Sequence, residues 1–149
     1  MRNRAAAIVI QDNKLLVIQR NNKGAEYYTF PGGGIEVGET SEQATVREVD
    51  EETSITITID RLVYQLDHDN GDTHYYYLCE YVSGTPSLRQ DSSEYADNLK
   101  GDNTYNPMWL DIDKINGITL YPEEATREFL KNLTEGFPEQ PVIIPAITH

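Results

Sequence analysis

The sequence has little cysteine and no long apolar run. Cys79 is its single cysteine and lies in an apolar stretch, which excludes an intramolecular disulfide and predicts an inert, buried thiol in a reducing compartment. No run approaches the roughly 20 apolar residues that a membrane-spanning helix needs, and we find no signal-peptide pattern. These absences predict a cytoplasmic protein without a membrane partner.

Positive charge is also scarce. Lys and Arg number 12 against 25 Asp and Glu, so the formal net charge is −13. A chain this acidic is repelled by phosphate backbones and by anionic lipid surfaces. We therefore expect no nucleic-acid polymer among its partners.

The length of 149 residues predicts one domain over residues 1–149. Its last stretch, residues 134–149, holds three prolines around the apolar residues 142–144. This tail could pack back on the domain, contact another subunit in a homodimer, or remain flexible.

Apolar segments separated by turn residues predict strands and hairpins. These segments are residues 4–10, 14–20, 55–59, 62–66, 74–82 and 106–111. A helix is expected from residue 122 to about 133, because its apolar residues fall on one side. Residues 87–105 are polar and have no clear period, which indicates either a long functional loop or a short irregular helix.

A second helix is expected over residues 41–53. Thr40 and Gln43 have the spacing of a capping box, which predicts where this helix begins. The flank expected to pack against the protein carries Val46, Val49 and Thr53.

Three carboxylates of this helix, Glu48, Glu51 and Glu52, fall within an arc of about 100°. Their mutual repulsion and the unfavourable helix dipole at its last turn call for a compensating cation. Mg²⁺ or Mn²⁺ would suit, since these ions prefer oxygen ligands and bridge carboxylates to substrate phosphates. The alternative is a solvated acidic helix face without a ligand.

The stretch from residue 33 to residue 55 resembles the signature of the Nudix hydrolases. The residues at the required spacing are Gly33, Glu39, Arg47, Glu48, Val49, Glu51, Glu52 and Ile55, preceded by Phe30, Pro31 and Gly32. Ser54 departs from the pattern, which has glycine there, just past the helix end. A positive φ is common at that position, so the departure concerns the geometry of the helix end.

The resemblance implies a mixed sheet between helices, an α/β/α sandwich of the α/β class, and a metal site. The implied ligands are Glu48, Glu52, Glu51, the carbonyl oxygen of Gly32 and one acid of residues 87–105, for which we choose Glu94 by position. Glu51 or Glu48 would be the general base, and Arg47 would orient these carboxylates.

Two further residues are expected to contact substrate. Three successive glycines let the backbone approach a ligand closely, and Gly33 is the second of them. By resemblance, Arg20 at the end of its predicted strand would bind a phosphate or base, the alternative being an ordinary surface arginine.

His68 and His74 flank a predicted turn and are interpreted as solvated, outside the site. Trp109 is expected in the core or a pocket wall.

The function implied is Mg²⁺-dependent or Mn²⁺-dependent hydrolysis of a small nucleotide, a nucleoside diphosphate linked to a moiety X. Residues 55–85 lack the proline that ADP-ribose enzymes tend to carry after the signature, which favours a nucleoside triphosphate, oxidised or not, cleaved to monophosphate and pyrophosphate. ADP-ribose, a nucleotide sugar and a dinucleoside polyphosphate remain alternatives. A non-catalytic nucleotide sensor is the alternative of another class, although such domains can lose carboxylates that this chain retains.

Overall fold

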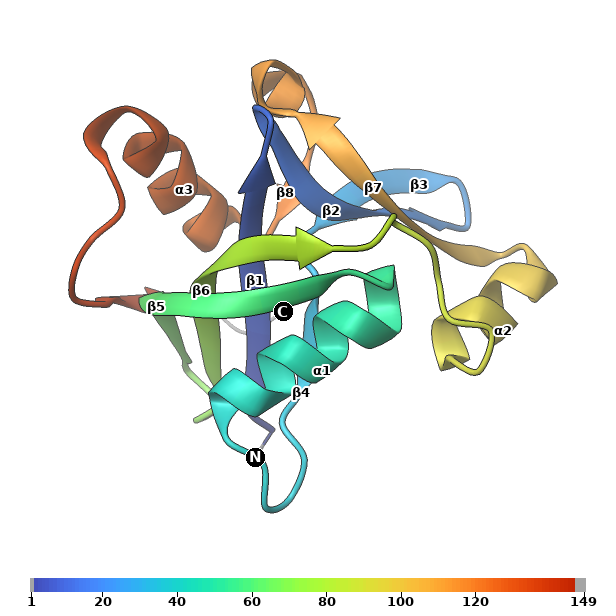
Figure 1. Cartoon of the computed structure of the whole chain (residues 1–149), viewed down its shortest axis with the longest axis horizontal. Helices are drawn as coiled ribbons and strands as arrows, with labels where there is room; N and C mark the ends of the chain where they lie inside the picture. Colours follow the sequence, from blue (N-terminus) through green and yellow to red (C-terminus); the bar gives the residue numbers. More distant parts are fainter. Residues whose placement is uncertain (1, 147–149) are drawn as a thin grey trace.

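The computed structural model describes residues 2–146 of the chain (Figure 1). In this part of the chain nine strands form a sheet with the order β8-β3-β2-β1-β6-β5-β9, where β4 pairs with β1 and β7 pairs with β2. The strands are β1 (Arg4–Gln11), β2 (Lys14–Asn22), β3 (Ala25–Thr29), β4 (Gly32–Gly34), β5 (Thr56–His68), β6 (Thr73–Ser83), β7 (Asn103–Asp111), β8 (Leu120–Tyr121) and β9 (Val142–Ala146). The helices are α1 (Ser41–Thr53), α2 (Ser93–Lys100), α3 (Glu123–Glu135) and the 3-10 helix η1 (Ile112–Gly117).

Strand β1 joins the two halves of the sheet. It runs parallel to β6 and antiparallel to β2 and β4, while β5 and β9 form a second parallel pair. The sheet is therefore mixed, as expected.

Helices α1 and α3 cover opposite faces of this sheet (Figure 1). Ile8 of β1 belongs to the apolar cluster that contains Phe129 of α3, whereas its neighbours Ala7 and Val9 belong to the cluster of Val49 in α1. Successive side chains of a strand point to opposite faces, so one strand supplies both cores. This layering confirms the expected α/β architecture.

Helix α1 begins as the sequence predicts. Thr40 Oγ1 accepts the Gln43 N–H at 3.1 Å, and the Gln43 side chain accepts the Thr40 N–H at 2.9 Å. The expectation for the packing flank is wrong for Val46, which is exposed, because the buried face of α1 turns instead toward Ala44 and Glu52.

The two segments left open by the sequence are ordered. Residues 87–105 contain α2 and the start of β7, so the short helix is the correct alternative. The tail packs back through β9, whose residues 142–146 pair with residues 64–68 of β5. The last three residues, 147–149, lie outside the described part of the chain.

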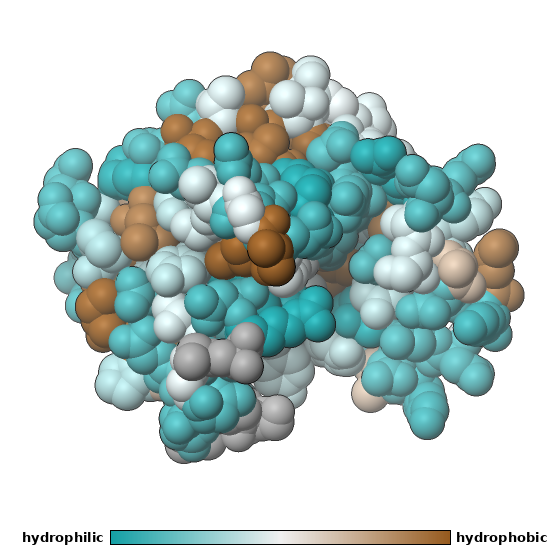
Figure 2. Space-filling model, turned by 90° about the horizontal axis from the view of Figure 1, so that it is seen from below, coloured by the Kyte–Doolittle hydropathy of each residue, from teal (hydrophilic) through white to brown (hydrophobic). Residues whose placement is uncertain are grey.

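The surface seen from below is mostly hydrophilic, with hydrophobic residues in small separate groups (Figure 2). No helix within residues 2–146 is long and apolar enough to cross a membrane. Cys79 is buried, as expected, and burial raises the pKa of its thiol to about 12.

Candidate active site

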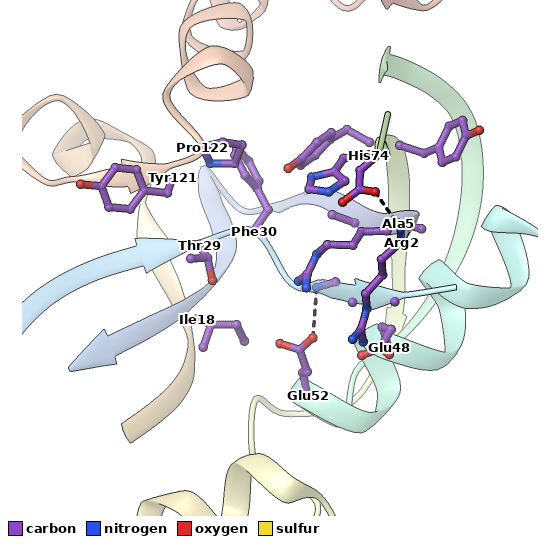
Figure 3. A pocket seen from close by; sticks show the side chains of 18 of the residues that line it. Arg2, Ala5, Ile18, Thr29, Phe30, Glu48, Glu52, His74, Tyr121 and Pro122 are labelled. Atoms are coloured by element: carbon purple, nitrogen blue, oxygen red, sulfur yellow. Dashed lines mark hydrogen bonds between the residues drawn. The ribbon is translucent and has the colours of Figure 1, made fainter. Parts of the chain in front are cut away.

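A cavity of about 710 Å³ opens beside the glycine-rich strand β4 (Figure 3). Strands β1, β2 and β6 and helices α1 and α2 contribute to its wall. Of the residues predicted for a site, the structure brings Arg20, Gly32, Gly33, Glu48, Glu52 and Glu94 to this cavity.

Glu48 and Glu52 are the carboxylates of α1 that line the cavity. They lie one turn apart, so both project from the same face of the helix. Glu52 is only 8% exposed and accepts the Gly32 N–H at 3.2 Å. Burial, followed by the negative charges of Glu48 and Glu94, raises the pKa of the Glu52 carboxyl well above its usual range. A negative charge at Glu52 is therefore costly without a compensating cation.

Burial also raises the pKa of Glu48, although its hydrogen bond from Arg47 and the positive charge of Arg47 oppose the shift. The side chain of Glu48 packs directly under Gly33. A Cβ atom at Gly33 would lie 2.5 Å from the Glu48 carboxylate, a distance that would force the carboxylate to move. Gly33 thus provides space for Glu48, and its predicted substrate contact stays a prediction.

Arg47 holds the acidic side chains of this region in place. Its guanidinium donates to both carboxylate oxygens of Glu39, at 2.7 and 2.9 Å, and to Glu48 Oε1 at 2.8 Å. It also donates to the Gly34 carbonyl oxygen at 2.9 Å. These bonds tie α1 to β4 and orient Glu48. Glu39 was assigned no role from the sequence, although its position in the signature was the signal that could have found it.

Glu51 lies apart from this pair. Its side chain is 41% exposed and accepts from Arg47 Nη1 at 3.3 Å. Unlike Glu48 and Glu52, it is not among the described residues that line the cavity. The structure therefore separates one of the three predicted carboxylates from the other two.

Helix α2 brings Glu94 to the same cavity. The Ser92 side chain caps α2 by accepting the Tyr95 N–H at 3.1 Å. The charge of Glu94 contributes to the raised pKa of both Glu48 and Glu52. A residue 42 positions beyond Glu52 in the sequence is thus electrostatically coupled to it.

Within residues 2–146, no three His, Cys, Asp or Glu side chains stand close enough together to form a ready-made metal site. Glu48 is instead engaged by Arg47, and Glu52 by the Gly32 amide. The chemistry of the donors nevertheless fits a hard divalent cation, because the candidate ligands are carboxylate oxygens whose mutual repulsion a cation would relieve. Glu48, Glu52 and Glu94 are the side chains that could hold it.

Arg20 has an aromatic environment at the cavity wall. Its guanidinium carbon lies 3.7 Å from the ring centroid of Tyr105, and its Nη2 donates to Asn103 Oδ1 at 2.5 Å. Among the described side chains, Arg20 Nε is the buried polar atom without a hydrogen-bond partner. An unpaired buried donor costs roughly 1–3 kcal/mol, so an acceptor on a ligand would stabilise Arg20. This arginine is not an ordinary surface residue.

The interpretation of His68 and His74 as solvated turn residues is wrong. Both are half-buried and line the cavity, with ring centroids 4.1 Å apart and His68 Nε2 at 3.0 Å from His74 Nδ1. Burial, followed by the nearby charges of His68 and Arg4, lowers the pKa of His74 to about 4. The available signal was alternation, since His74 shares a strand face with the buried Tyr76 two residues later.

Trp109 packs against the apolar cluster of Val49, and its ring meets that of Tyr81 edge-on at 5.6 Å. It belongs to the core, which is one of its two expected locations.

Three known proteins illustrate what the chain is similar to. The 8-oxo-dGTP diphosphatase of Escherichia coli K12 is 38% identical over 88 residues, which cover 55% of this chain and 68% of that protein. The ADP-ribose pyrophosphatase of Methanocaldococcus jannaschii is 49% identical over 49 residues, which cover 32% of this chain and 29% of the relative. NAD-capped RNA hydrolase NudC of Vibrio atlanticus is 29% identical over 142 residues, which cover 95% of this chain but only 48% of NudC.

Solved structures share the fold at low sequence identity. A NUDIX hydrolase from Nitrosomonas europaea superimposes with a TM-score of 0.76 at 16% identity, covering 99% of this chain and 79% of that one. A sequence model of the NUDIX domain matches residues 1–133. Since this match spans most of the chain and contains the whole α1 signature, the chain belongs to the NUDIX family.

Proposed function

We propose that this protein is a divalent-metal-dependent pyrophosphohydrolase acting on a nucleoside diphosphate linked to a moiety X. The observation that carries the proposal is the pair formed by the half-buried Glu48 and the buried Glu52, whose negative charges oppose each other in a cavity large enough for a nucleotide. Repulsion between two such carboxylates lowers the stability of the fold, whereas together they can bind a metal ion. Membership of a hydrolase family supports the same conclusion.

Glu48, Glu52 and Glu94 would hold Mg²⁺ or Mn²⁺, with the Gly32 carbonyl and Glu51 as further predicted ligands. When bound, the metal would neutralise diphosphate oxygens and lower the pKa of a coordinated water. Arg47 keeps Glu48 in position through its bond to Oε1, which leaves Oε2 to accept a proton from water. Glu48 is favoured over Glu51 as the general base because it lines the cavity.

A nucleoside triphosphate is the favoured substrate. Its hydrolysis would add one water and break the bond between the first and second phosphates, giving nucleoside monophosphate and pyrophosphate. The E. coli relative, whose name is 8-oxo-dGTP diphosphatase, supports this choice, including for oxidised bases. The M. jannaschii relative keeps ADP-ribose as the alternative.

Arg20 is proposed to contact the base or a phosphate through its unpaired Nε, and the Gly33 backbone to approach the phosphates. A small-molecule site of this kind requires no second subunit. A possible homodimer and a cytoplasmic location stay predictions from the sequence.

The experiment is a substrate panel with Mg²⁺ that contains nucleoside triphosphates, their 8-oxo forms, ADP-ribose, a dinucleoside polyphosphate and NAD-capped RNA. Glu52→Gln should lower kcat on the best substrate by at least about 100-fold, because it removes a ligand charge while keeping the shape. Glu42→Gln is the matched control, since Glu42 lies exposed on the same helix, and it should retain activity.

Two results would contradict the proposal. Mg²⁺-dependent turnover by Glu52→Gln at the wild-type rate would remove the carboxylate pair from the chemistry. Nucleotide binding without hydrolysis of any member of the panel would favour the non-catalytic sensor.

A further inference from the structure

Positively charged and imidazole side chains gather at one end of the cavity, in a chain that has only 12 Lys and Arg. Arg2, Arg4, His68 and His74 all line the cavity, and we call this group the cationic corner. Figure 3 shows Arg2 and His74 on the same side of the cavity, with the Arg2 side chain extending toward Glu48.

The pairing of strands brings this group together. Arg4 of β1 stands opposite His74 of β6 in the parallel pair, so their side chains share one face. His68 approaches from the adjacent strand β5 and contacts His74 through one nitrogen of each ring. The second nitrogen of each ring is therefore left for another partner.

Acidic groups lie beside the two arginines of this corner. Asp72 accepts the backbone N–H of Arg2 at 2.7 Å and is the acid of the β5–β6 turn that lines the cavity here. Two guanidinium groups thus lie near one carboxylate of the turn, and the positive charge of Arg4 also acts on the buried Glu52, where it opposes the rise in pKa that burial causes. The cavity is thus strongly polarised, with carboxylates beside a cationic subsite.

The opposite side of the cavity has a different chemistry. Figure 3 shows Thr29, Tyr121 and Pro122 there, with Glu52 between this side and the one that carries Arg2 and His74. The stacked pair Arg20 and Tyr105 also lines the cavity. Flat rings and a guanidinium plane suit a nucleobase. A nucleotide would therefore lie with its base near these residues, its diphosphate at Glu48 and Glu52, and X at the cationic corner.

We propose, on the basis of the function proposed above, that the cationic corner binds the terminal phosphate of a nucleoside triphosphate, so that X is a phosphate group. Guanidinium groups pair with phosphate oxygens through charge-assisted, often bidentate hydrogen bonds. In ADP-ribose the group that follows the diphosphate is a neutral sugar, which would offer Arg2 and Arg4 no phosphate oxygen. The corner thus favours binding of triphosphates over binding of nucleotide sugars. It would also contact the pyrophosphate product.

Binding of inorganic tripolyphosphate and of ribose 5-phosphate, measured by calorimetry with and without Mg²⁺, tests the corner independently of turnover. Arg4→Gln and His74→Asn should each weaken tripolyphosphate binding about 10-fold, the loss expected for one hydrogen bond to a charged group. Their affinity for ribose 5-phosphate should change less than about twofold. Lys131→Gln, which removes one positive charge from the exposed side of α3, is the control for net charge.

The proposal is overturned if the wild-type protein binds no tripolyphosphate, or if both corner variants bind it as the wild type does. An equal loss in Lys131→Gln would also overturn it, since the effect would then come from net charge. Melting curves of the variants show whether Arg4→Gln alters the sheet, and His74→Asn provides a second, smaller change.

Kinetics separate this inference from the proposed function. Both corner variants should raise KM for a triphosphate about 10-fold and leave KM for ADP-ribose unchanged. If Glu52→Gln abolishes hydrolysis but the corner variants affect both substrates equally, the hydrolase function stands and the cationic corner is wrong. If no substrate is hydrolysed but selective tripolyphosphate binding persists, the corner stands and the hydrolase function is wrong.

Discussion

At the scale of single residues, Arg47 shows how one side chain can organise a site without lining the cavity. It bonds to Glu39, Glu48 and Glu51 and to the Gly34 carbonyl. These bonds need a planar group with several donors in fixed directions, which lysine cannot reproduce. Arg47 is therefore a positioning residue that acts through Glu48.

We expect Arg47→Lys to lower kcat by about 10-fold to 100-fold, because a displaced Glu48 no longer meets water in the productive geometry. KM should change little, since Arg47 does not line the cavity. Steady-state kinetics measure both effects. A variant with unchanged kcat would show that Glu48 needs no positioning by Arg47.

His74 should make stability depend on pH. Its pKa is lowered to about 4 in the folded protein, against about 6.5 in the unfolded chain. Between these values the unfolded chain binds more protons, so this contribution to stability is lost as pH falls from 6.5 toward 4. Burial lowers this pKa most, the charges of His68 and Arg4 lower it further, and Asp72 opposes the shift.

Urea unfolding at pH 7.5 and pH 5 measures this effect. The free energy of unfolding should decrease more on acidification in the wild-type protein than in His74→Asn. An identical decrease in both proteins would show that His74 is not held neutral.

At the scale of elements, helix α1 is defined at both ends by local chemistry. The Thr40 capping box begins it, and Ser54 ends it with φ 62°, the left-handed conformation that glycine adopts at lowest cost. Ser54 also donates a hydrogen bond to the Ser87 carbonyl at 2.7 Å, and its Oγ accepts one from Ser87 Oγ at 3.1 Å. Where the family pattern has glycine, the serine side chain thus forms hydrogen bonds to Ser87, in the segment before α2.

We expect Ser54→Gly to be more stable than Ser54→Ala by about 1 kcal/mol, because alanine keeps the backbone strain and lacks the tether. Relative to wild type, the glycine variant relieves the backbone strain but loses two exposed hydrogen bonds, so its net change should be within about 0.5 kcal/mol. Urea melts of the three proteins test this. Equal stability of the two variants would mean that the helix end is unstrained.

At the scale of the whole molecule, net charge and the acidic cavity act in the same direction. The chain carries −13, and the charges of Glu48 and Glu94 oppose a negative charge on the buried Glu52 in the absence of a cation. A divalent cation that binds only the folded state should therefore stabilise it. Screening by salt also stabilises an acidic protein, so the comparison needs matched ionic strength.

Millimolar Mg²⁺ should raise Tm above the value in NaCl of equal ionic strength, by about 2–4 °C for each kcal/mol of binding free energy. Glu52→Gln should lose most of this gain, whereas Glu42→Gln should keep it. Differential scanning calorimetry provides the measurement. The same gain in all three proteins would assign it to general screening.

The sequence by itself was sufficient for the local features of this protein. The 3.6-residue period of α1 places Glu48 and Glu52 on one face, and the Thr40 capping box marks where the helix begins, because both depend on residues within two turns of each other. The spacing of the signature residues also predicted the family and, through the family, the α/β fold. The choice between loop and helix for residues 87–105 could not be made in this way, since the segment has no strong period.

Only the tertiary structure decided which of these local features meet. The parallel register of β1 and β6 brings Arg4 next to His74, 70 positions later, and the pairing of β2 with β7 brings Arg20 next to Tyr105. It also decided that Glu52 is buried under the glycine-rich strand while Glu51 faces solvent. Strand register and the orientation of a helix on a sheet are set by the packing of all core residues together, so contacts of this range cannot be inferred from any one stretch of the sequence.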